Sequence, residues 1–212
     1  MRVTPAVSDG MEHDGPVRTG SLIVLNGPSS AGKSTLAVAL QQQFAADGEC
    51  WFVYGMDDYF AKVPFDWVAA GKHQGPHAEE GVVLEVVDGA FGIRLGPIGQ
   101  RVLYAWRGAV GAAVRAGLNV IADEVVLTEE DWQGWQTELD GLDPHWVRVD
   151  IALDVLEERE RSRPDPRLPG HARSQHAVVH VHPTYDAEVD TGLLDPDAAA
   201  SAVLADWRAR AQ

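Results

Sequence analysis

Residues 27–35 carry the strongest chemical signal in the chain. Gly27, Gly32, Lys33 and Ser34 satisfy the pattern G-x-x-x-x-G-K-[ST], in which the glycines let main-chain N–H groups close around phosphate oxygens. The lysine supplies a charge to the β- and γ-phosphates, the serine hydroxyl ligates Mg²⁺, and a following helix adds the positive end of its dipole. We therefore predict that ATP and Mg²⁺ bind here, through Gly27, Pro28, Ser29, Ser30, Ala31, Gly32, Lys33, Ser34 and Thr35.

A pair of acidic residues after a second apolar segment is suited to phosphoryl transfer to an alcohol. Such a transfer needs a hydroxyl oxygen in line with the γ-phosphate and a carboxylate that takes its proton. Asp57 and Asp58 follow the apolar segment 50–54, and we favour Asp57 as this general base. The alternative is that both residues cap a helix or lie in a solvated turn.

A second acidic pair ends the apolar segment 118–122. Asp123 is predicted to hold Mg²⁺ together with Ser34, or to contact the substrate, because an aspartate at the end of a buried strand has this role in P-loop enzymes. The alternative is that it caps a helix. Glu124 is a weaker candidate for the same role.

The densest basic cluster of this acidic chain lies between residues 159 and 173. It contains Arg159, Arg161, Arg163, Arg167 and Arg173. Guanidinium groups stabilise the charge that develops on a transferring phosphoryl group, so we predict a nucleotide lid over residues 157–176. Its predicted catalytic arginines, which act with Lys33, are Arg159, Arg163 and Arg167. Surface ion pairs with Glu157, Glu158 or Glu160 are the alternative. The histidines nearby match no closed zinc set.

The elements that must position these groups alternate between strands and helices. Short apolar runs predict strands at 21–26, 50–54, 118–122 and 146–151, while apolar residues at helical spacing predict helices at 33–44 and 97–114, with further helices beginning at Thr128 and Asp154. Asp154 with Glu157 resembles a capping box. This order predicts an α/β fold with a doubly wound, mainly parallel sheet flanked by helices. Strand 50–54 is expected to lie beside strand 21–26, and ligands bind beyond the strand ends.

Three other regions differ from this alternation. Residues 1–20 are predicted to be a flexible extension, and residues 21–212 a single P-loop kinase domain. Residues 60–100 are predicted to be an insert on the substrate side. In this insert, residues 67–81 are irregular, and a hairpin joins 82–86 to 91–95 through the turn Asp88-Gly89. The aromatic residues Phe65, Trp67 and Phe91, with few basic neighbours, favour a neutral, partly apolar acceptor.

The amino-acid composition restricts the classes of binding partner and the cellular compartment. The 212 residues have a formal net charge of -15, which disfavours nucleic acid as a partner. The single cysteine, Cys50, cannot form an intrachain disulfide and is expected to be a buried thiol in a reducing compartment. No apolar segment is long enough to span a membrane, and the N-terminus lacks the apolar core of a signal peptide. We expect a cytoplasmic protein without membrane or nucleic-acid partners. Whether the chain forms a homo-oligomer stays open.

Several motifs together resemble the chloramphenicol phosphotransferase family, over most of residues 22–191. They are Leu25-Asn-Gly-Pro-Ser-Ser-Ala-Gly-Lys-Ser34, Gly55-Met-Asp57, Ile121-Ala-Asp-Glu-Val125, Arg159-Glu160 with Arg163 and Arg167, Gly170-His-Ala-Arg-Ser-Gln175, Val178-Val-His180 and Tyr185-Asp186. The resemblance implies a P-loop kinase fold, ATP and Mg²⁺, an arginine-bearing lid, and Asp57 at the position of the family's proposed base. Residues 60–100 depart from the family, so chloramphenicol is only one candidate acceptor.

The sequence therefore predicts an ATP-dependent O-phosphotransferase that phosphorylates a hydroxyl of a small molecule, an antibiotic in the favoured interpretation. Two alternatives stay open. One is a metabolic kinase for a sugar acid, a shikimate-like acid or a nucleoside, and the other is a non-catalytic ATP-sensing module. The absence of an Asn-Lys-x-Asp guanine-reading sequence disfavours a GTPase.

Overall fold

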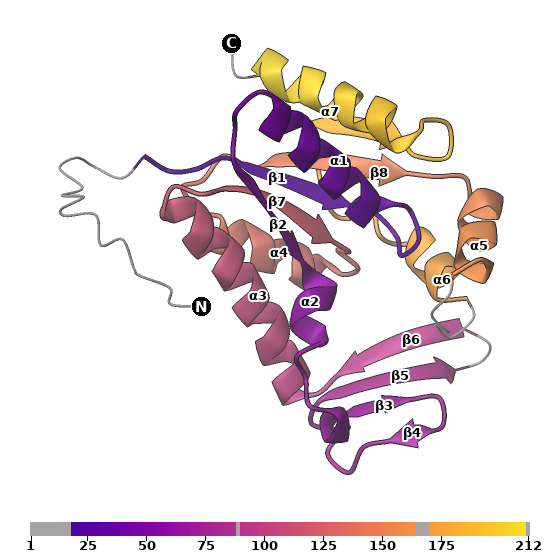
Figure 1. Cartoon of the computed structure of the whole chain (residues 1–212). Helices are drawn as coiled ribbons and strands as arrows, with labels where there is room; N and C mark the ends of the chain where they lie inside the picture. Colours follow the sequence, from indigo (N-terminus) through magenta and orange to yellow (C-terminus); the bar gives the residue numbers. More distant parts are fainter. Residues whose placement is uncertain (1–17, 88–89, 164–169, 211–212) are drawn as a thin grey trace, which may run out of the picture.

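The computed structural model describes residues 18–87, 90–163 and 170–210. Its main sheet has five strands, all parallel, in the order β2-β7-β1-β8-β9. Helices lie above and below this sheet (Figure 1). The strands are β1 (Leu22–Asn26), β2 (Trp51–Gly55), β7 (Asn119–Glu124), β8 (His145–Asp150) and β9 (Ala187–Asp190). The helices are α1 (Lys33–Ala46), α2 (Met56–Phe60), α3 (Pro97–Arg115), α4 (Glu129–Glu138), α5 (Leu153–Arg161), α6 (His171–His176) and α7 (Pro196–Arg210).

Two hydrophobic clusters lie on opposite faces of the main sheet. On one face, side chains of α1 and α7 such as Leu40 and Val203 pack on Ile23 and Leu25 of β1. On the other face, Trp106 of α3 and Trp135 of α4 belong to the second cluster, with the alternate residues of β1. A strand buried on both faces is apolar throughout, and all five residues of β1 are buried. The predicted doubly wound α/β fold is confirmed.

The expected neighbour of the first strand is wrong. β7 lies between β1 and β2, with Leu25 in register with Asp123, and Asp123 in register with Gly55. The exposure of the strands explains this order. Val120, Ile121 and Ala122 of β7 are completely buried, as a central strand requires, whereas Phe52 of β2 is 41% exposed, as an edge strand allows. Residues 55 and 123 still end at the same edge of the sheet.

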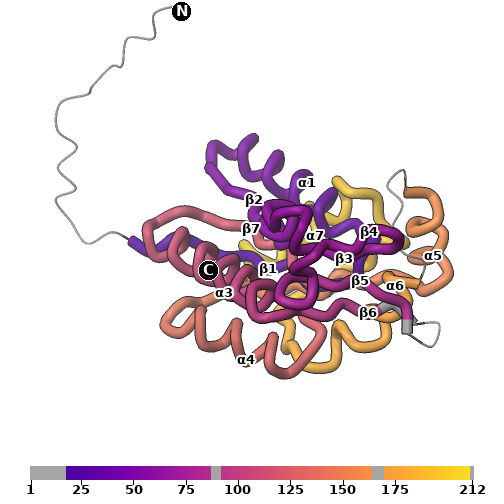
Figure 2. The backbone as a smooth tube through the Cα atoms, turned by 90° about the horizontal axis from the view of Figure 1, so that it is seen from below, coloured from indigo at the N-terminus to yellow at the C-terminus, as the bar shows by residue number. Residues whose placement is uncertain are grey.

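The region 60–100 forms a second, four-stranded sheet that extends below the main sheet in Figure 1. Its order is β4-β3-β5-β6, with β3 (Val68–Ala70), β4 (His73–Gln74), β5 (Val82–Val87) and β6 (Ala90–Leu95). The predicted hairpin pairing is confirmed, since β5 and β6 are antiparallel; its turn, Asp88-Gly89, lies outside the described residues. The expectation that residues 67–81 are irregular is wrong, because the short strand β3 adds in parallel to β5. Figure 2 shows the same sheet from below.

Local expectations had mixed outcomes. Thr128 caps α4 in a reciprocal capping box with Asp131. The predicted capping box at Asp154 is wrong, because α5 begins one residue earlier with Ala152 at the N-cap and Asp154 lies within the first turn.

Cys50 is exposed rather than buried, since it precedes the edge strand β2. The predicted extension falls mainly on residues 1–17, outside the described residues. None of the described helices is long and apolar enough to cross a membrane.

Candidate active site

The predicted phosphate-binding loop connects β1 to α1, and its backbone accounts for both glycines. A Cβ at Gly27 would lie 2.5 Å from the carbonyl oxygen of Val149 in β8, so a side chain there would push adjacent strands apart. Gly32 has a φ of 88°, which residues with a side chain rarely adopt. Ser30 also has a positive φ, 67°, and such conformations concentrate at functional sites. The loop therefore makes the tight turn that phosphate binding requires.

Lys33 and Ser34, at the start of α1, both contact Asp123 at the end of β7. The Ser34 hydroxyl donates to Asp123 Oδ2 at 2.5 Å, and Lys33 Nζ lies 3.5 Å from Oδ1. Lys33 Nζ also donates to the Pro28 carbonyl at 3.0 Å. A hydroxyl and a carboxylate are oxygen ligands that suit Mg²⁺, which usually takes few protein ligands besides phosphates and water. In the described part of the chain, no group of three His, Cys, Asp or Glu residues could hold a metal.

Three consecutive residues of the loop are held by the segment that contains α5 and α6. Gln175 Oε1 accepts from the main-chain N–H of Ser29 at 2.7 Å, and Arg163 Nη1 donates to Ser30 Oγ at 3.2 Å. The Ala31 carbonyl accepts from Arg159 Nη1 at 3.4 Å and from the Thr191 hydroxyl at 2.6 Å. Arg159 Nη2 also donates to the Thr191 carbonyl at 2.6 Å.

The predicted arginine cluster thus divides into two groups. Arg159 and Arg163 reach the phosphate-binding loop. Arg161 and Arg173 instead form surface ion pairs with Glu158 and Glu157 on α5, which is the alternative that the sequence left open. Arg167 lies outside the described residues, so its predicted role stays a prediction.

A cavity of about 370 Å³ lies beside the loop on the side of α5 and α7. Residues of the loop line it together with Arg159 and Arg163, and so do the apolar residues Leu194, Pro196 and Ala199. A lining that combines a phosphate-binding loop with apolar side chains suits a nucleotide, whose base is a flat ring and whose phosphates are charged. This cavity is the candidate nucleotide site.

Asp57 lies in α2, directly beyond the end of β2. Gly55 is in register with Asp123, so the sheet brings the loop after β2 to the same edge as Asp123. Asp57 is exposed and lines a second cavity of about 720 Å³. Ser29 lines both cavities, and among the described lining residues it alone does so. The candidate base and the candidate phosphate loop therefore face a common space.

The second cavity is lined mostly by apolar side chains from distant parts of the chain. They come from α2, from β3, β5 and β6 of the second sheet, from α3 and from the loop after β7, and include Met56, Phe60, Val68, Leu84, Ile93, Leu95, Leu103 and Leu127. Phe65 and Trp67, which the sequence suggested for this wall, do not line it; they pack on His73 and His77 instead. Other apolar residues of the region 60–100 line the cavity, and the side chain of Phe91 lies outside the described part of the structure. That this region contacts a substrate stays a prediction.

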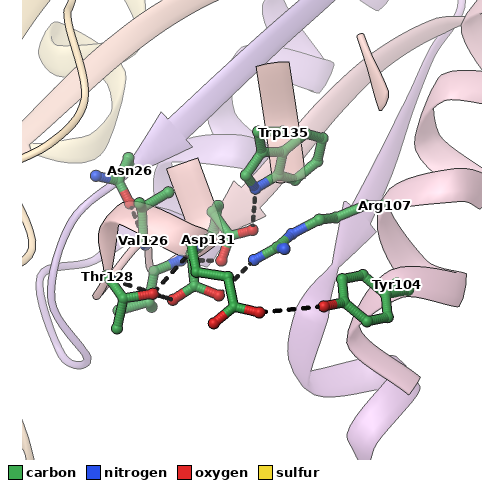
Figure 3. A network of polar contacts seen from close by, with 10 residues as sticks. Asn26, Tyr104, Arg107, Val126, Thr128, Asp131 and Trp135 are labelled. Atoms are coloured by element: carbon green, nitrogen blue, oxygen red, sulfur yellow. Dashed lines mark hydrogen bonds and ion pairs between the residues drawn. The ribbon is translucent and has the colours of Figure 1, made fainter. Parts of the chain in front are cut away.

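Both arginines on the described wall of this cavity are paired with carboxylates. Arg107, only 2% exposed, donates to Asp131 Oδ1 at 2.7 Å (Figure 3). Arg94 bonds to Glu79 and lies 3.6 Å from Glu85. The carboxylates of Asp57, Glu130 and Asp131 line the same cavity. The arginines of the wall therefore offer no excess positive charge to an anionic ligand.

Glu124 lies behind this wall rather than in either cavity. Its carboxylate accepts from Trp135 Nε1 at 2.5 Å and from the Val125 N–H at 2.6 Å. It is completely buried, and burial raises its pKa to about 7, against the opposing effect of the nearby Arg107. Figure 3 shows its partner Trp135 near the Arg107–Asp131 pair. Val125 lines the cavity, so Glu124 positions the wall.

Asn26, at the end of β1, joins the loop after β7 to the segment after α6. Its Oδ1 accepts from the Val126 N–H at 2.8 Å, and its Nδ2 donates to the Tyr185 hydroxyl at 2.6 Å and the Val179 carbonyl at 2.9 Å. His180 Nδ1 lies 2.7 Å from the same hydroxyl. Burial lowers the pKa of His180 to about 4 and raises that of Tyr185 to about 12, so both are neutral at pH 7.

Comparison with known proteins identifies the family. Residues 20–208 match the model of the family described as chloramphenicol phosphotransferase-like protein. The chain belongs to this family. This chloramphenicol phosphotransferase-like chain has a relative in Mycobacterium tuberculosis, strains CDC 1551 and H37Rv, that is provisionally named an O-phosphotransferase. This chain and that relative are 33% identical over 174 residues, which are 81% of this chain and 75% of the relative.

Solved structures with a similar fold include several kinases. A sugar kinase from Janibacter sp. HTCC2649 has a TM-score of 0.62 at 16% identity and covers 89% of this chain and 95% of its own. The Mycobacterium tuberculosis APS kinase CysC, in complex with AMPPNP and APS, has a TM-score of 0.61 at 15% identity, with coverages of 90% and 98%. The Deinococcus radiodurans tunicamycin resistance protein has a TM-score of 0.54 at 16% identity, with coverages of 88% and 95%. At these identities the likeness concerns the fold alone.

Sequence reasoning missed several residues of the candidate site in this chloramphenicol phosphotransferase-like chain. Arg107, on the buried face of α3, carried no signal other than a charge within an apolar pattern. Thr191 follows β9, which the sequence did not predict as a strand. Gln175 was noted in a family motif without a role. The contacts of all three are between residues far apart in the sequence, at 24 positions or more.

Proposed function

We propose that this protein transfers the γ-phosphoryl group of ATP to a hydroxyl of an uncharged, partly apolar small molecule, an antibiotic in the favoured case. The observation that carries the proposal is the meeting of two cavities at Ser29, one beside the phosphate-binding loop and one lined by Asp57 and apolar side chains. Family membership supports the class of reaction. The pairing of the wall arginines supports an uncharged acceptor.

In the proposed reaction, the acceptor hydroxyl oxygen attacks the γ-phosphorus while the bond from that phosphorus to the β–γ bridging oxygen breaks. ADP leaves, and the hydroxyl proton passes to the carboxylate of Asp57. Lys33 contacts the β- and γ-phosphates, and Arg163 moves from Ser30 to the transferring group. Mg²⁺, when bound, neutralises phosphate charge, and Ser34 and Asp123 are the residues that would hold it.

The size and chemistry of the acceptor cavity constrain the substrate. Its volume of about 720 Å³ is within the usual range for drug-sized ligands. Aliphatic side chains from the second sheet favour apolar parts of the acceptor, whereas Asp57 and Glu130 disfavour carboxylates and phosphates nearby. These features favour an antibiotic or other secondary metabolite over the sugar acids and shikimate-like acids that a metabolic kinase would phosphorylate.

A screen by mass spectrometry tests the proposal. The full chain is incubated with ATP, Mg²⁺ and a panel that contains chloramphenicol, other hydroxylated antibiotics, nucleosides and sugar acids. We expect a gain of one phosphoryl group on a neutral acceptor, with ADP in equal amount, and no transfer by Lys33→Ala. Transfer to a sugar acid but to no neutral compound would support the metabolic alternative. A folded protein that binds ATP and phosphorylates nothing in the panel would favour the sensing alternative.

A further inference from the structure

Gln175 holds the point at which the two cavities meet. It lies in α6 and is 5% exposed, and its Oε1 accepts from the main-chain N–H of Ser29 at 2.7 Å. Ser29 lines both cavities, whereas Gln175 lines the acceptor cavity. A phosphoryl group that passes from ATP to an acceptor must cross this boundary, so the Gln175 side chain lies beside its path.

The bond to Ser29 fixes the orientation of the amide. A main-chain N–H is a donor, so only the oxygen end of the amide can face it, and the nitrogen end with its two N–H donors must face elsewhere. Within the described part of the chain, no protein group accepts a hydrogen bond from Gln175 Nε2. The same side chain lines the acceptor cavity, so a ligand oxygen in that cavity can accept from it.

The elements around Gln175 keep it in place. Glu160 of α5 accepts from the N–H groups of Gly170 and Ala172 at 3.2 and 2.7 Å, which ties the start of α6 to α5. Arg159, next to Glu160, bonds to Ala31 of the phosphate-binding loop. A donor that is fixed before the reaction stabilises developing charge without reorganisation, which is why such donors have large effects on rate.

We propose that Gln175 is a further catalytic residue, whose Nε2 donates a hydrogen bond to an oxygen of the γ-phosphoryl group as that group moves to the acceptor. Its Oε1 at the same time holds Ser29. This inference rests on the proposed phosphotransferase function and adds to it a neutral donor on the acceptor side of the phosphoryl group, opposite the charged donors Lys33 and Arg163.

Two substitutions separate the two ends of the amide. Gln175→Glu keeps an oxygen for the Ser29 N–H but removes both N–H donors, while Gln175→Leu removes both functions in a side chain of similar size. Gln42→Glu is the matched control, because it makes the same chemical change at an exposed position of α1. Steady-state kinetics with the acceptor from the screen, the Kd for AMPPNP and thermal unfolding are measured for all four proteins.

We expect Gln175→Glu to lower kcat by about 100-fold, because loss of one fixed donor to a developing oxyanion has an effect of this order. Its KM values and its Kd for AMPPNP should stay within about threefold of wild type. Gln175→Leu should lose kcat similarly and also bind AMPPNP more weakly, because the Ser29 N–H loses its partner. Gln42→Glu should match wild type.

The pH dependence adds a test that a structural role alone would not pass. Protonation of the new carboxyl in Gln175→Glu restores one donor while the other oxygen still accepts from Ser29. The ratio of its kcat to that of wild type should therefore rise as the pH falls from 8 to 5.5. A wild-type kcat in Gln175→Glu, or a raised acceptor KM with unchanged kcat, would overturn the inference. A wild-type protein that transfers no phosphoryl group would instead refute the proposed function.

Discussion

The proposed nucleotide cavity and the proposed acceptor cavity meet at Ser29, but their walls have different origins. The phosphate side of the first cavity is formed mainly by one consecutive stretch, residues 27–35, whose geometry depends on the backbone at Gly27 and Gly32, and Arg159 and Arg163 complete it. The acceptor cavity is assembled from side chains of α2, three strands of the second sheet, α3, α4, α6 and the loop after β7. One wall depends on main-chain conformation, and the other depends on long-range packing.

This difference explains why two parts of one site can be subject to different constraints. The phosphates of a nucleotide are the same whichever molecule accepts the phosphoryl group, and main-chain N–H groups in a tight turn suit them. An acceptor is recognised by shape and by a few polar groups, so its wall can change while the phosphate loop stays the same. Substitutions on the two sides should therefore have separable effects on turnover, stability and acceptor affinity.

Asp57→Asn should have the largest effect. It removes the proposed proton acceptor while it keeps the size and the position of the side chain at the start of α2. We expect kcat to fall by about 1,000-fold, as loss of general base catalysis usually does, with an unchanged Kd for AMPPNP by calorimetry. Asp58→Asn is the matched control and should retain most turnover. Full activity of Asp57→Asn would remove Asp57 from the mechanism and leave the acceptor side without its proposed base.

The next largest effect is expected from Glu124, and it concerns the free energy of unfolding. Its folded pKa of about 7 exceeds the ordinary value of 4.5 because of burial, so the folded state holds the proton more tightly than the unfolded state. This contribution to stability is fully present below pH 4.5 and is lost as the pH rises through 7. The loss is about 3 kcal/mol at most, or about 300-fold in the folding equilibrium.

Urea unfolding of wild type and Glu124→Gln at pH 5 and pH 8 measures this contribution. Glu124→Gln cannot ionise, so its stability relative to that of wild type should be higher at pH 8 than at pH 5. The difference between the free energies of unfolding of the two proteins cancels the contribution of every titrating group that both proteins contain. A difference that does not vary with pH would mean that Glu124 has an ordinary pKa in the folded protein.

The phosphate side could be predicted from the sequence because its signal is local. The pattern from Gly27 to Ser34, the strand before it and the helix after it all lie within 25 residues. Asp123 was predicted from its place at the end of an apolar strand, and it does contact Lys33 and Ser34. The register of parallel strands brings such strand ends together without any information about side-chain packing.

The strand order and the acceptor wall could not be predicted in the same way. Nothing in the local pattern of residues 51–55 says that β7 rather than β2 pairs with β1, because both strands are apolar. The wall residues Leu84, Ile93 and Arg107 face a cavity only because two sheets and α3 converge. The aromatic character of Phe65 and Trp67 predicts a place in this wall, but both side chains pack on histidines within their own segment.

Arg163→Ala tests the nucleotide side of the comparison and should have a smaller effect. Arg163 contacts Ser30 Oγ and lines the nucleotide cavity, so its loss should lower kcat by about 30-fold through loss of charge stabilisation, while the acceptor KM stays within about twofold. Arg161→Ala is the matched control, because Arg161 is paired with Glu158 on the surface, and it should keep wild-type turnover. Equal kinetics of the two variants would remove Arg163 from phosphoryl transfer.

Ile93→Ala tests the acceptor side and should have the smallest effect. Ile93 lines the acceptor cavity from β6 and is 40% exposed, so a bound acceptor would cover part of a side chain that is not fully buried. Removal of three carbons should raise the acceptor KM by about fivefold, since each buried methylene contributes about 0.8 kcal/mol when it is fully covered. The KM for ATP should not change. Val86→Ala is the matched control, because Val86 is 49% exposed on the paired strand β5 and does not line the cavity. Both variants could instead raise the KM for ATP as much as the KM for the acceptor. The two cavities would then be energetically coupled, and the proposed separation between the nucleotide side and the acceptor side would be wrong.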